Sequence, residues 1–188
     1  MTERKDRVCP VALAGSLDSR FRRLFQNPRR LVGPYLRQGM TVLDVGCGPG
    51  FFVVEIADLV GPSGRVIAAD LQPEMLDRLR AKIRGTALER RITLHPCQPG
   101  RLGAPGPVDF VLAFWVLHEL PDQGAFFREA REILAQEGRM LLVEPPLHVS
   151  RCEFEATIRL AESEGFAVEE RPRILFNKTA LLRPGAHA

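Results

Sequence analysis

The stretch Thr41–Phe52, TVLDVGCGPGFF, decides the fold of this 188-residue chain. An apolar run typical of a buried strand leads into three closely spaced glycines, and apolar residues at helical spacing follow them. Gly46, Gly48 and Gly50 carry no Cβ atom, so backbone N–H groups in this turn can approach a bound molecule. The stretch therefore predicts a strand, a ligand-binding turn and a helix.

A second predicted strand, Arg65–Ala69, closes on Asp70, which lies 24 residues after Gly46. A dinucleotide-binding fold places an acid there to accept hydrogen bonds from ribose hydroxyls. Nicotinamide-binding folds have the pattern G-x-G-x-x-G. Here the third glycine comes one residue early, and Phe51 stands at the position of the last glycine in that pattern. A nicotinamide site and an ordinary tight turn stay open as alternatives.

The remaining pattern predicts an α/β fold with a Rossmann-like sheet of seven strands. The sheet is expected to be mostly parallel with an antiparallel last strand and with helices on both faces, because a tight connection at Pro172 joins the last two strands. A proline-rich loop is predicted over 96–107. The other predicted strands are Arg91–His95, Val108–Phe114, Arg139–Val143, Phe166–Arg171 and Ile174–Leu182, and the other helices span about 73–85, 122–135 and 150–164.

Two motifs together resemble a known family. VLDVGCGPG, followed by the strand that ends in Asp70, resembles the class I methyltransferases that use S-adenosylmethionine. The segment Asp109–Asp122, DFVLAFWVLHELPD, is similar to the fourth strand and following loop of the ubiquinone-biosynthesis and methyltransferase type 11 members. The resemblance is close over Gly39–Val143. It implies S-adenosylmethionine as cofactor and methyl transfer as the reaction.

The resemblance also implies which residues bind the cofactor. Asp44 would steady the glycine turn and the methionine amino end, Asp70 would bind the ribose, and Leu71 would cover one face of adenine. The family has Gly-Asp after its third strand, where this chain has Cys97 and Gln98. Asp44 and Asp70 could instead only cap helices or neighbouring turns. The complete expected set is Asp44, Gly46, Cys47, Gly48, Gly50, Asp70, Leu71, Cys97, Gln98 and Phe114.

The residues after the fourth strand restrict the acceptor. Enzymes that methylate the exocyclic amines of nucleic-acid bases carry Asn-Pro-Pro-Tyr or a similar set here, whereas this chain has Ala-Phe-Trp-Val at 113–116. Phe114 and Trp115 suit a flat or greasy small molecule, or they simply belong to the core. His118 and His148 are the candidate catalytic bases, because an imidazole can take a proton near neutral pH. Each could also be only a hydrogen-bonded structural residue.

The N-terminal segment is predicted to hold two helices before the first strand. One would begin at Ser16, and the other would run from Pro28 to Gly39. We expect residues 1–38 to form a helical cap and 39–188 the methyltransferase domain, as one domain overall. In the resembling family such helices lie across the pocket and shape the acceptor site, but here they could equally cover a sheet edge.

Composition limits the remaining choices. Residues 1–40 hold nine Arg and Lys against three acids, which suits nucleic acid, an anionic lipid surface or simply a solvated face. The four cysteines form no CxxC pair and no signal peptide precedes them, so a reduced cytoplasmic protein is expected. No metal is expected, although Cys9, His148 and Cys152 could in principle collect one. No apolar run reaches the roughly 20 residues of a membrane span.

These observations predict an S-adenosylmethionine-dependent methyltransferase with a small-molecule acceptor, which is either a monomer or a homodimer. A non-catalytic S-adenosylmethionine-binding module and a nicotinamide-dependent oxidoreductase are the alternatives. A nucleic-acid methyltransferase recruited by the basic N-terminal segment is a third, and it is disfavoured by the apolar sequence at 113–116.

Overall fold

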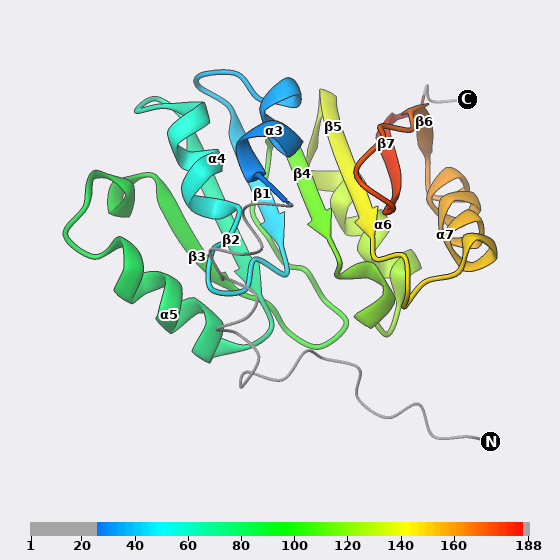
Figure 1. The fold of residues 1–188 in the computed structure, drawn as a ribbon, viewed down its shortest axis with the longest axis horizontal. Coiled ribbons are helices and arrows are strands. Elements are labelled where there is room, and N and C mark those ends of the chain that lie inside the picture. The colour runs from blue at the N-terminus through cyan, green and yellow to red at the C-terminus, as the bar shows by residue number, and fades with distance from the viewer. Residues whose placement is uncertain (1–25, 186–188) are drawn as a thin grey trace.

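A computed structural model describes residues 26–185 and contains one seven-stranded sheet (Figure 1). The strand order is β3-β2-β1-β4-β5-β7-β6. Strands β1 to β5 are mutually parallel, and β7 is antiparallel to both of its neighbours. The strands are β1 Thr41–Val45, β2 Arg65–Asp70, β3 Ile92–Pro96, β4 Val108–Phe114, β5 Leu134–Glu144, β6 Phe166–Glu170 and β7 Lys178–Pro184. The predicted α/β fold class is confirmed.

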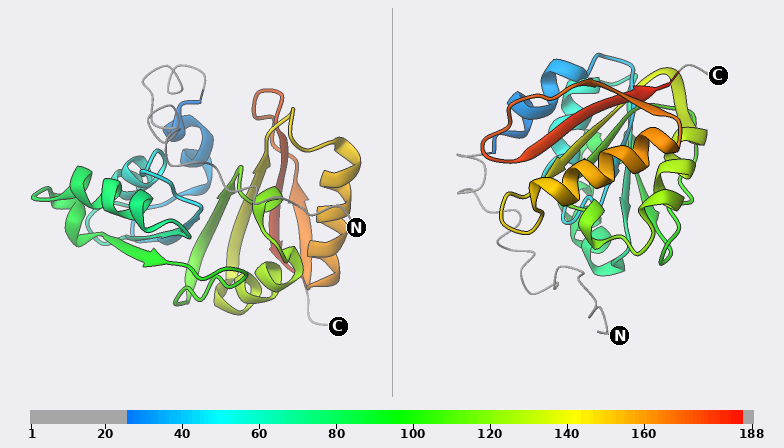
Figure 2. Two further views of the ribbon diagram at one scale, coloured as in Figure 1. Left: turned by 90° about the horizontal axis from the view of Figure 1, so that it is seen from below. Right: turned by 90° about the vertical axis from the view of Figure 1, so that its right-hand side faces the viewer.

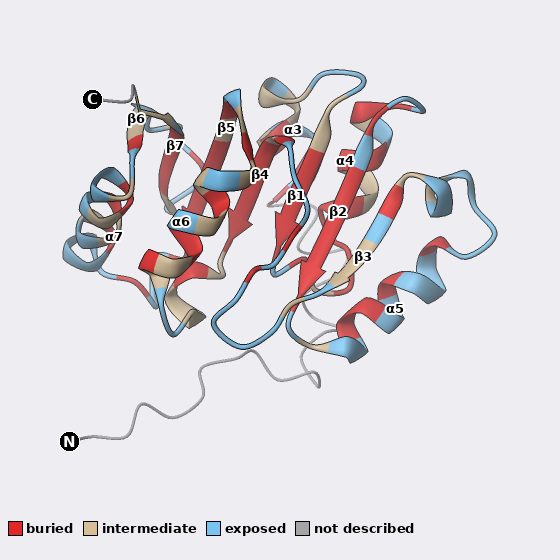
Figure 3. Cartoon of the chain, turned by 180° about the vertical axis from the view of Figure 1, so that it is seen from behind, coloured by how far each residue is buried: buried red, intermediate tan, exposed pale blue. Residues whose placement is uncertain are grey.

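Helices cover both faces of the sheet (Figures 1 and 3). On one face lie α3 Pro28–Val32, α4 Val53–Val60 and α5 Pro73–Ile83. On the other lie α6 Gln123–Ile133 and α7 Arg151–Ser163, and Figure 2 shows α7 running beside β6 and β7. Three short 3-10 turns complete the elements: η2 Gly33–Tyr35, η3 Ala87–Arg90 and η4 Leu117–Glu119. No helix in residues 26–185 is long and apolar enough to cross a membrane.

The two helical layers bury alternate residues of the same strands. On β1, Leu43 and Val45 pack toward α6 and α7, whereas Val42 packs toward α4 and α5. A strand with two buried faces must be apolar at nearly every position, which explains the continuous apolar runs in the sequence. Figure 3 shows these central strands as buried along most of their length.

The described N-terminal part differs from its prediction. The helix expected from Pro28 to Gly39 ends as an α-helix at Val32 and continues only as the 3-10 turn η2. Pro34 explains the change, because it has no N–H to donate to the carbonyl one helical turn back. This segment packs on α4 and Phe110. The helix predicted from Ser16 lies outside the described residues.

Two strand boundaries were also predicted wrongly. Strand β5 begins at Leu134, directly after α6, because Leu134 pairs with Val108 at the start of β4. The prediction instead continued the helix to Ala135 and began the strand at Arg139. Strand β7 begins at Lys178 and not at Ile174. Ile174 belongs to the loop 171–177, and its side chain is buried in the core. The predicted tight turn at Pro172 is therefore a longer loop.

Tyr35, the single tyrosine of the chain, provides a test of this packing. Its burial, with the charge of Glu170 and a hydrogen bond to that carboxylate, raises the pKa of Tyr35 from 10.0 to about 12. We expect tyrosinate absorbance of the folded protein to have its midpoint near pH 12, and near pH 10 in denaturant. The folded state keeps the Tyr35 proton to a higher pH than the unfolded state does. The stability linked to Tyr35 is therefore complete below pH 10 and is lost as pH rises through about 12. Glu170→Gln should lower the folded midpoint, and a wild-type midpoint of 10 would contradict the packing.

Candidate functional site

A pocket of about 780 Å³ lies at the carboxyl ends of the parallel strands. Residues that follow β1, β2, β3, β4 and β5 all contribute to its lining. Between β1 and β4 the chain changes the direction in which it adds strands, and ligands of open α/β sheets bind outside such a switch point. The volume lies within the usual range for cofactor and small-molecule pockets, about 300–1,000 Å³.

The three glycines of the β1–α4 turn have different reasons to be glycine. All three have positive φ angles, of 67°, 54° and 85° at Gly46, Gly48 and Gly50. A Cβ atom at Gly46 would come 2.6 Å from Val116, and one at Gly50 would come 2.5 Å from Leu79. A Cβ atom at Gly48 would meet no protein atom within 4 Å. Gly48 therefore faces the pocket, whereas Gly50 lies outside its lining and permits close packing on α5.

Asp70 ties the glycine turn to the end of β2. Its Oδ2 accepts a hydrogen bond of 2.8 Å from the Gly48 amide, and its Oδ1 accepts one of 2.9 Å from the Gln72 amide. Burial raises the pKa of the Asp70 carboxyl, and the backbone amides oppose that rise by stabilising the anion. Each carboxylate oxygen accepts more than one hydrogen bond, so Asp70 can also accept from a ligand's hydroxyl groups.

The other expected cofactor residues surround this carboxylate. Asp44 is 2% exposed at the end of β1, and Leu71, directly after β2, is 40% exposed. The Cys97 amide donates to the Asp70 carbonyl at 2.9 Å, which places the β3 loop beside β2. Gln98 is exposed and lines the pocket. Nine of the ten expected residues line the pocket, namely Asp44, Gly46, Cys47, Gly48, Asp70, Leu71, Cys97, Gln98 and Phe114.

The two cysteines of this group are held as neutral thiols. Burial, followed by the charges of Asp44 and Asp70, raises the pKa of Cys47 well above its ordinary value. Burial and the charges of Asp70 and Glu129 raise the pKa of Cys97 to about 11. Because the thiolate is the nucleophile and metal ligand, neither cysteine is activated for such chemistry.

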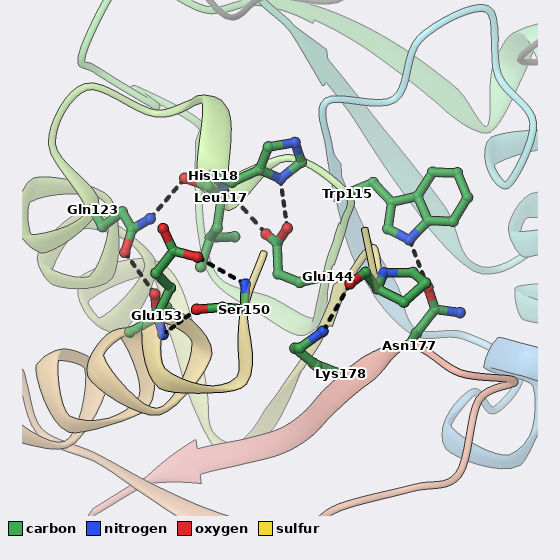
Figure 4. A network of polar contacts seen from close by, with 11 residues as sticks. Trp115, Leu117, His118, Gln123, Glu144, Ser150, Glu153, Asn177 and Lys178 are labelled. Atoms are coloured by element: carbon green, nitrogen blue, oxygen red, sulfur yellow. Dashed lines mark hydrogen bonds and ion pairs between the residues drawn. The ribbon is translucent and has the colours of Figure 1, made fainter. Parts of the chain in front are cut away.

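An aromatic wall stands at the end of β4. Phe114 packs between Phe52 and Trp115, with ring centroids 4.6 and 5.3 Å away, and all three line the pocket. Trp115 has a φ angle of 60°, which is unusual for a bulky residue. Its amide donates to the Val143 carbonyl at 2.7 Å and its indole Nε1 donates to Asn177 Oδ1 at 3.0 Å (Figure 4). These bonds hold the indole in place.

His118 lies on the 3-10 turn η4, opposite Glu144 at the end of β5 (Figure 4). The His118 Nδ1 and Glu144 Oε2 atoms are 2.5 Å apart, and the His118 amide donates to Oε1 at 3.3 Å. Glu144 is 2% exposed. A carboxylate can only accept, so Nδ1 carries the hydrogen, and in the neutral imidazole Nε2 is the acceptor atom. Glu144 therefore fixes the tautomer of the neutral ring.

The η4 end of this pair is anchored by Gln123. Gln123 Nε2 donates to the Leu117 carbonyl at 2.9 Å, and its Oε1 accepts from Thr157 on α7 at 3.0 Å, which fixes η4 (Figure 4). His148 lies in the loop before α7, and its ring centroid is 6.0 Å from that of His118. Both predicted bases line the pocket.

Sequence reasoning missed two partners. Glu144 was expected only as the end of the fifth strand, and Asn177 as part of a strand interior. The available signal for Glu144 was an acid directly after the apolar run 140–143, as Asp70 directly follows the apolar run 66–69. Of the suggested metal ligands, Cys152 is exposed and Cys9 lies outside the described residues. Within 26–185 no three His, Cys, Asp or Glu side chains are grouped to hold a metal ion.

The fold is a Rossmann-like nucleotide-binding fold. It is defined by the doubly wound sheet, the glycine turn and the carboxylate that closes β2. Residues 36–169 match a family described as methyltransferase domain. A demethylmenaquinone methyltransferase of Lactococcus lactis is 29% identical over 62% of this chain and 48% of that protein. The ubiquinone/menaquinone biosynthesis C-methyltransferase UbiE of Pasteurella multocida is 32% identical over 58% of this chain and 41% of that protein. The chain thus matches less than half the length of either relative.

Solved structures agree in fold. A SAM-dependent methyltransferase from Aquifex aeolicus superposes with a TM-score of 0.82 at 23% identity, covering 93% of this chain and 98% of that one. A putative S-adenosyl-L-methionine-dependent methyltransferase from Methanococcus maripaludis has a TM-score of 0.79 at 15% identity, covering 100% and 99%. The chain belongs to the methyltransferase domain family, and its fold is that of an S-adenosylmethionine-dependent methyltransferase. The open cradle at Gly48 and the carboxylate of Asp70 fit that cofactor.

Proposed function

We propose that this chain transfers the methyl group of S-adenosylmethionine to a small, flat and largely apolar acceptor. The supporting observation is that His118, which is hydrogen-bonded to Glu144, and Trp115 line the same pocket as Gly48 and Asp70. When bound, S-adenosylmethionine supplies a methyl group on a positively charged sulfur for in-line attack. The protein's main task is then to align the acceptor with that methyl group.

On the cofactor side, we assign the roles by position. Asp70 accepts from the ribose hydroxyls, and the pocket-facing backbone at Gly48 and Gly46 contacts the methionine part. Asp44 binds the amino end, Leu71 covers the adenine, and the exposed amide of Gln98 accepts from the adenine amino group. Cys47, Cys97 and Phe114 complete the walls, and Gly50 sets the shape of the turn by its packing on Leu79.

On the acceptor side, Phe114 and Trp115 provide the flat apolar surface against which the acceptor lies. His118 Nε2 takes the proton from a hydroxyl or activated carbon as the new bond to the methyl group forms. Glu144 holds the imidazole by its Nδ1–H and stabilises the charge that the ring gains. His148, whose ring centroid is 6.0 Å from that of His118, hydrogen-bonds the acceptor in this proposal.

The relatives narrow the acceptor class further. Two of them are named for demethylmenaquinone and for ubiquinone or menaquinone biosynthesis, so their acceptors are quinone-type rings. In its reduced, quinol form such a ring is flat and electron-rich, carries an apolar tail and presents an acidic hydroxyl group to a base. We therefore propose a quinone-like or phenolic ring as the acceptor, with a nucleic-acid base as the weaker alternative.

The cofactor assignment is tested by calorimetric titration with S-adenosylhomocysteine and with NADH. We expect binding of S-adenosylhomocysteine and none of NADH, because Phe51 occupies the place where a nicotinamide-binding turn has its last glycine. Binding of NADH alone would support an oxidoreductase and sink the proposal.

The acceptor assignment is tested with methyl-labelled S-adenosylmethionine. Chemically reduced demethylmenaquinone, simple phenols and catechols, and RNA are offered in separate reactions. Label should pass into an organic-extractable quinone or phenol product. Label found only in RNA would favour the nucleic-acid alternative, and binding of the cofactor without transfer to any class would favour a binding module.

The Asn177–Trp115 hydrogen bond gives a prediction specific to the acceptor wall. Asn177→Ala removes the acceptor of the indole N–H, so the ring loses its fixed orientation. We expect a rise of about 10-fold in KM for the acceptor, the usual effect of about 1.4 kcal/mol, with the cofactor Kd unchanged. Trp115 is the single tryptophan, so its emission reports the change directly. Equal effects on both ligands would place Trp115 outside the acceptor site.

A further inference from the structure

Three large apolar side chains project into solvent at one end of the sheet. Leu147 is 93% exposed, Phe176 is 86% exposed and Leu175 is 55% exposed. Among the described residues, one other large apolar side chain is exposed, that of Leu71, and it lines the pocket. We refer to Leu147, Leu175 and Phe176 as the apolar rim.

The members of the apolar rim lie on two loops that leave the sheet at one point. Glu144 and Lys178 are the final pair between β5 and β7, so the chain after β5 and the chain before β7 diverge there. Lys178 Nζ donates to the Pro146 carbonyl at 3.3 Å and joins the loops (Figure 4). Leu147 and the Leu175–Phe176 pair therefore project from neighbouring loops.

The rim is attached to the wall of the pocket. Asn177, the residue after Phe176, accepts from the Trp115 indole and donates to the Ile174 and Leu175 carbonyls. On the loop after β5, Leu147 lies between Pro145 and His148 in the sequence, and both of these residues line the pocket. The exposed apolar groups thus flank the end of the pocket where the acceptor wall stands.

The charge of the two loops is of one sign. Segments 145–152 and 171–178 contain four arginines and lysines and no aspartate or glutamate: Arg151, Arg171, Arg173 and Lys178. Arg171 forms an ion pair with Glu155 on α7 at 2.7 Å, and the charge of Glu155 also interacts with Arg151. Apolar tips with a surrounding set of cations match the interface of a membrane with anionic lipids, where the tips enter the headgroup layer and the cations contact phosphate.

We propose that the apolar rim docks this protein on an anionic phospholipid surface, with the acceptor end of the pocket beside the bilayer. Two loop tips present too little area for a stable protein dimer, which buries about 800 Å² on each partner. The docking itself involves no cofactor, so its test is independent of the methyl-transfer test.

The experiment is flotation of the 188-residue chain with phosphatidylcholine vesicles, with and without phosphatidylglycerol. We expect binding to the mixed vesicles, weaker binding to phosphatidylcholine alone, and a loss of binding as salt is raised. The double variant Leu147→Ser with Phe176→Ser should reduce partition by about 10-fold or more, because two apolar side chains no longer enter the interface. Arg173→Ser should reduce it by about fivefold on the mixed vesicles alone.

Arg84→Ser is the matched charge control. Arg84 is exposed after α5, at the other end of the sheet order from β7 (Figure 1), and its loss should leave partition unchanged. The rim variants should keep the wild-type affinity for S-adenosylhomocysteine, because none of the substituted residues lines the pocket.

Two outcomes would overturn the proposal. Partition of the double variant within twofold of wild type would assign any vesicle binding to another surface. A wild-type dimer in sedimentation velocity that the double variant converts to a monomer, without vesicle binding, would assign the rim to a second copy of the chain.

Discussion

Gly48→Val is expected to abolish binding of S-adenosylhomocysteine, weakening it by about 100-fold or more. The β-branched side chain would enter the space that Gly48 leaves open, where no protein atom lies within 4 Å. Overpacking of a preformed site costs about 1–3 kcal/mol, and the added side chain keeps a ligand away from the backbone at this position. Calorimetric titration with S-adenosylhomocysteine measures the loss.

The strain of the substitution must be separated from its effect on the pocket. Gly48 has a φ angle of 54°, and any L-residue there costs about 1–2 kcal/mol of folding stability. Gly85 is the matched control, since its φ is 71° and a Cβ there also meets no atom within 4 Å, but it lies after α5 and outside the pocket lining. Gly85→Val should lose a similar amount of stability and keep wild-type affinity. Equal affinity in both variants would remove Gly48 from the cofactor site.

His118→Ala should lower kcat for methyl transfer by about 10²- to 10⁴-fold while the Kd for S-adenosylhomocysteine stays within twofold. The reason is that the imidazole is the proton acceptor in the proposed reaction and not part of the cofactor cradle. Glu144→Gln keeps the size of the side chain but removes the charge that stabilises the protonated ring, so we expect a loss of about 10- to 100-fold in kcat. Single-turnover rates with the selected acceptor measure both.

His95→Ala is the control for loss of a histidine. The His95 ring is hydrogen-bonded to the Leu102 carbonyl at 2.8 Å and lies outside the pocket lining. Its removal should cost about 1 kcal/mol of stability without changing kcat. If His118→Ala kept kcat within threefold of wild type, the histidine would be a structural residue and another group would take the proton.

The pattern of the sequence predicts the sheet well because its central strands have two buried faces. The predicted limits of β2 and β4 were accurate to within one residue, and Gly64 and Pro107 directly precede those strands. The starts of β5 and β7 were wrong because pairing between distant strands decides them. Leu134 extends because Val108 is beside it, and Ile174 is buried without belonging to a strand.

The candidate site divides in the same way. The cofactor residues were predicted because the glycine turn and Asp70 belong to one local unit of strand, turn, helix and strand. Glu144 and Asn177 were missed because their partners, His118 and Trp115, are 26 and 62 positions away in the chain. Only the spatial order of β4, β5 and β7 makes them neighbours.

Because β7 lies between β5 and β6, different loops form the two sides of the pocket. The turns after β1, β2 and β3 make the proposed cofactor cradle, whereas the loop before β7 supports the wall on the other side. Substitutions in the loop between β6 and β7 could therefore change the acceptor without changing the methyl donor. Diversity among descendants of this architecture should therefore accumulate at 171–177 sooner than in the glycine turn.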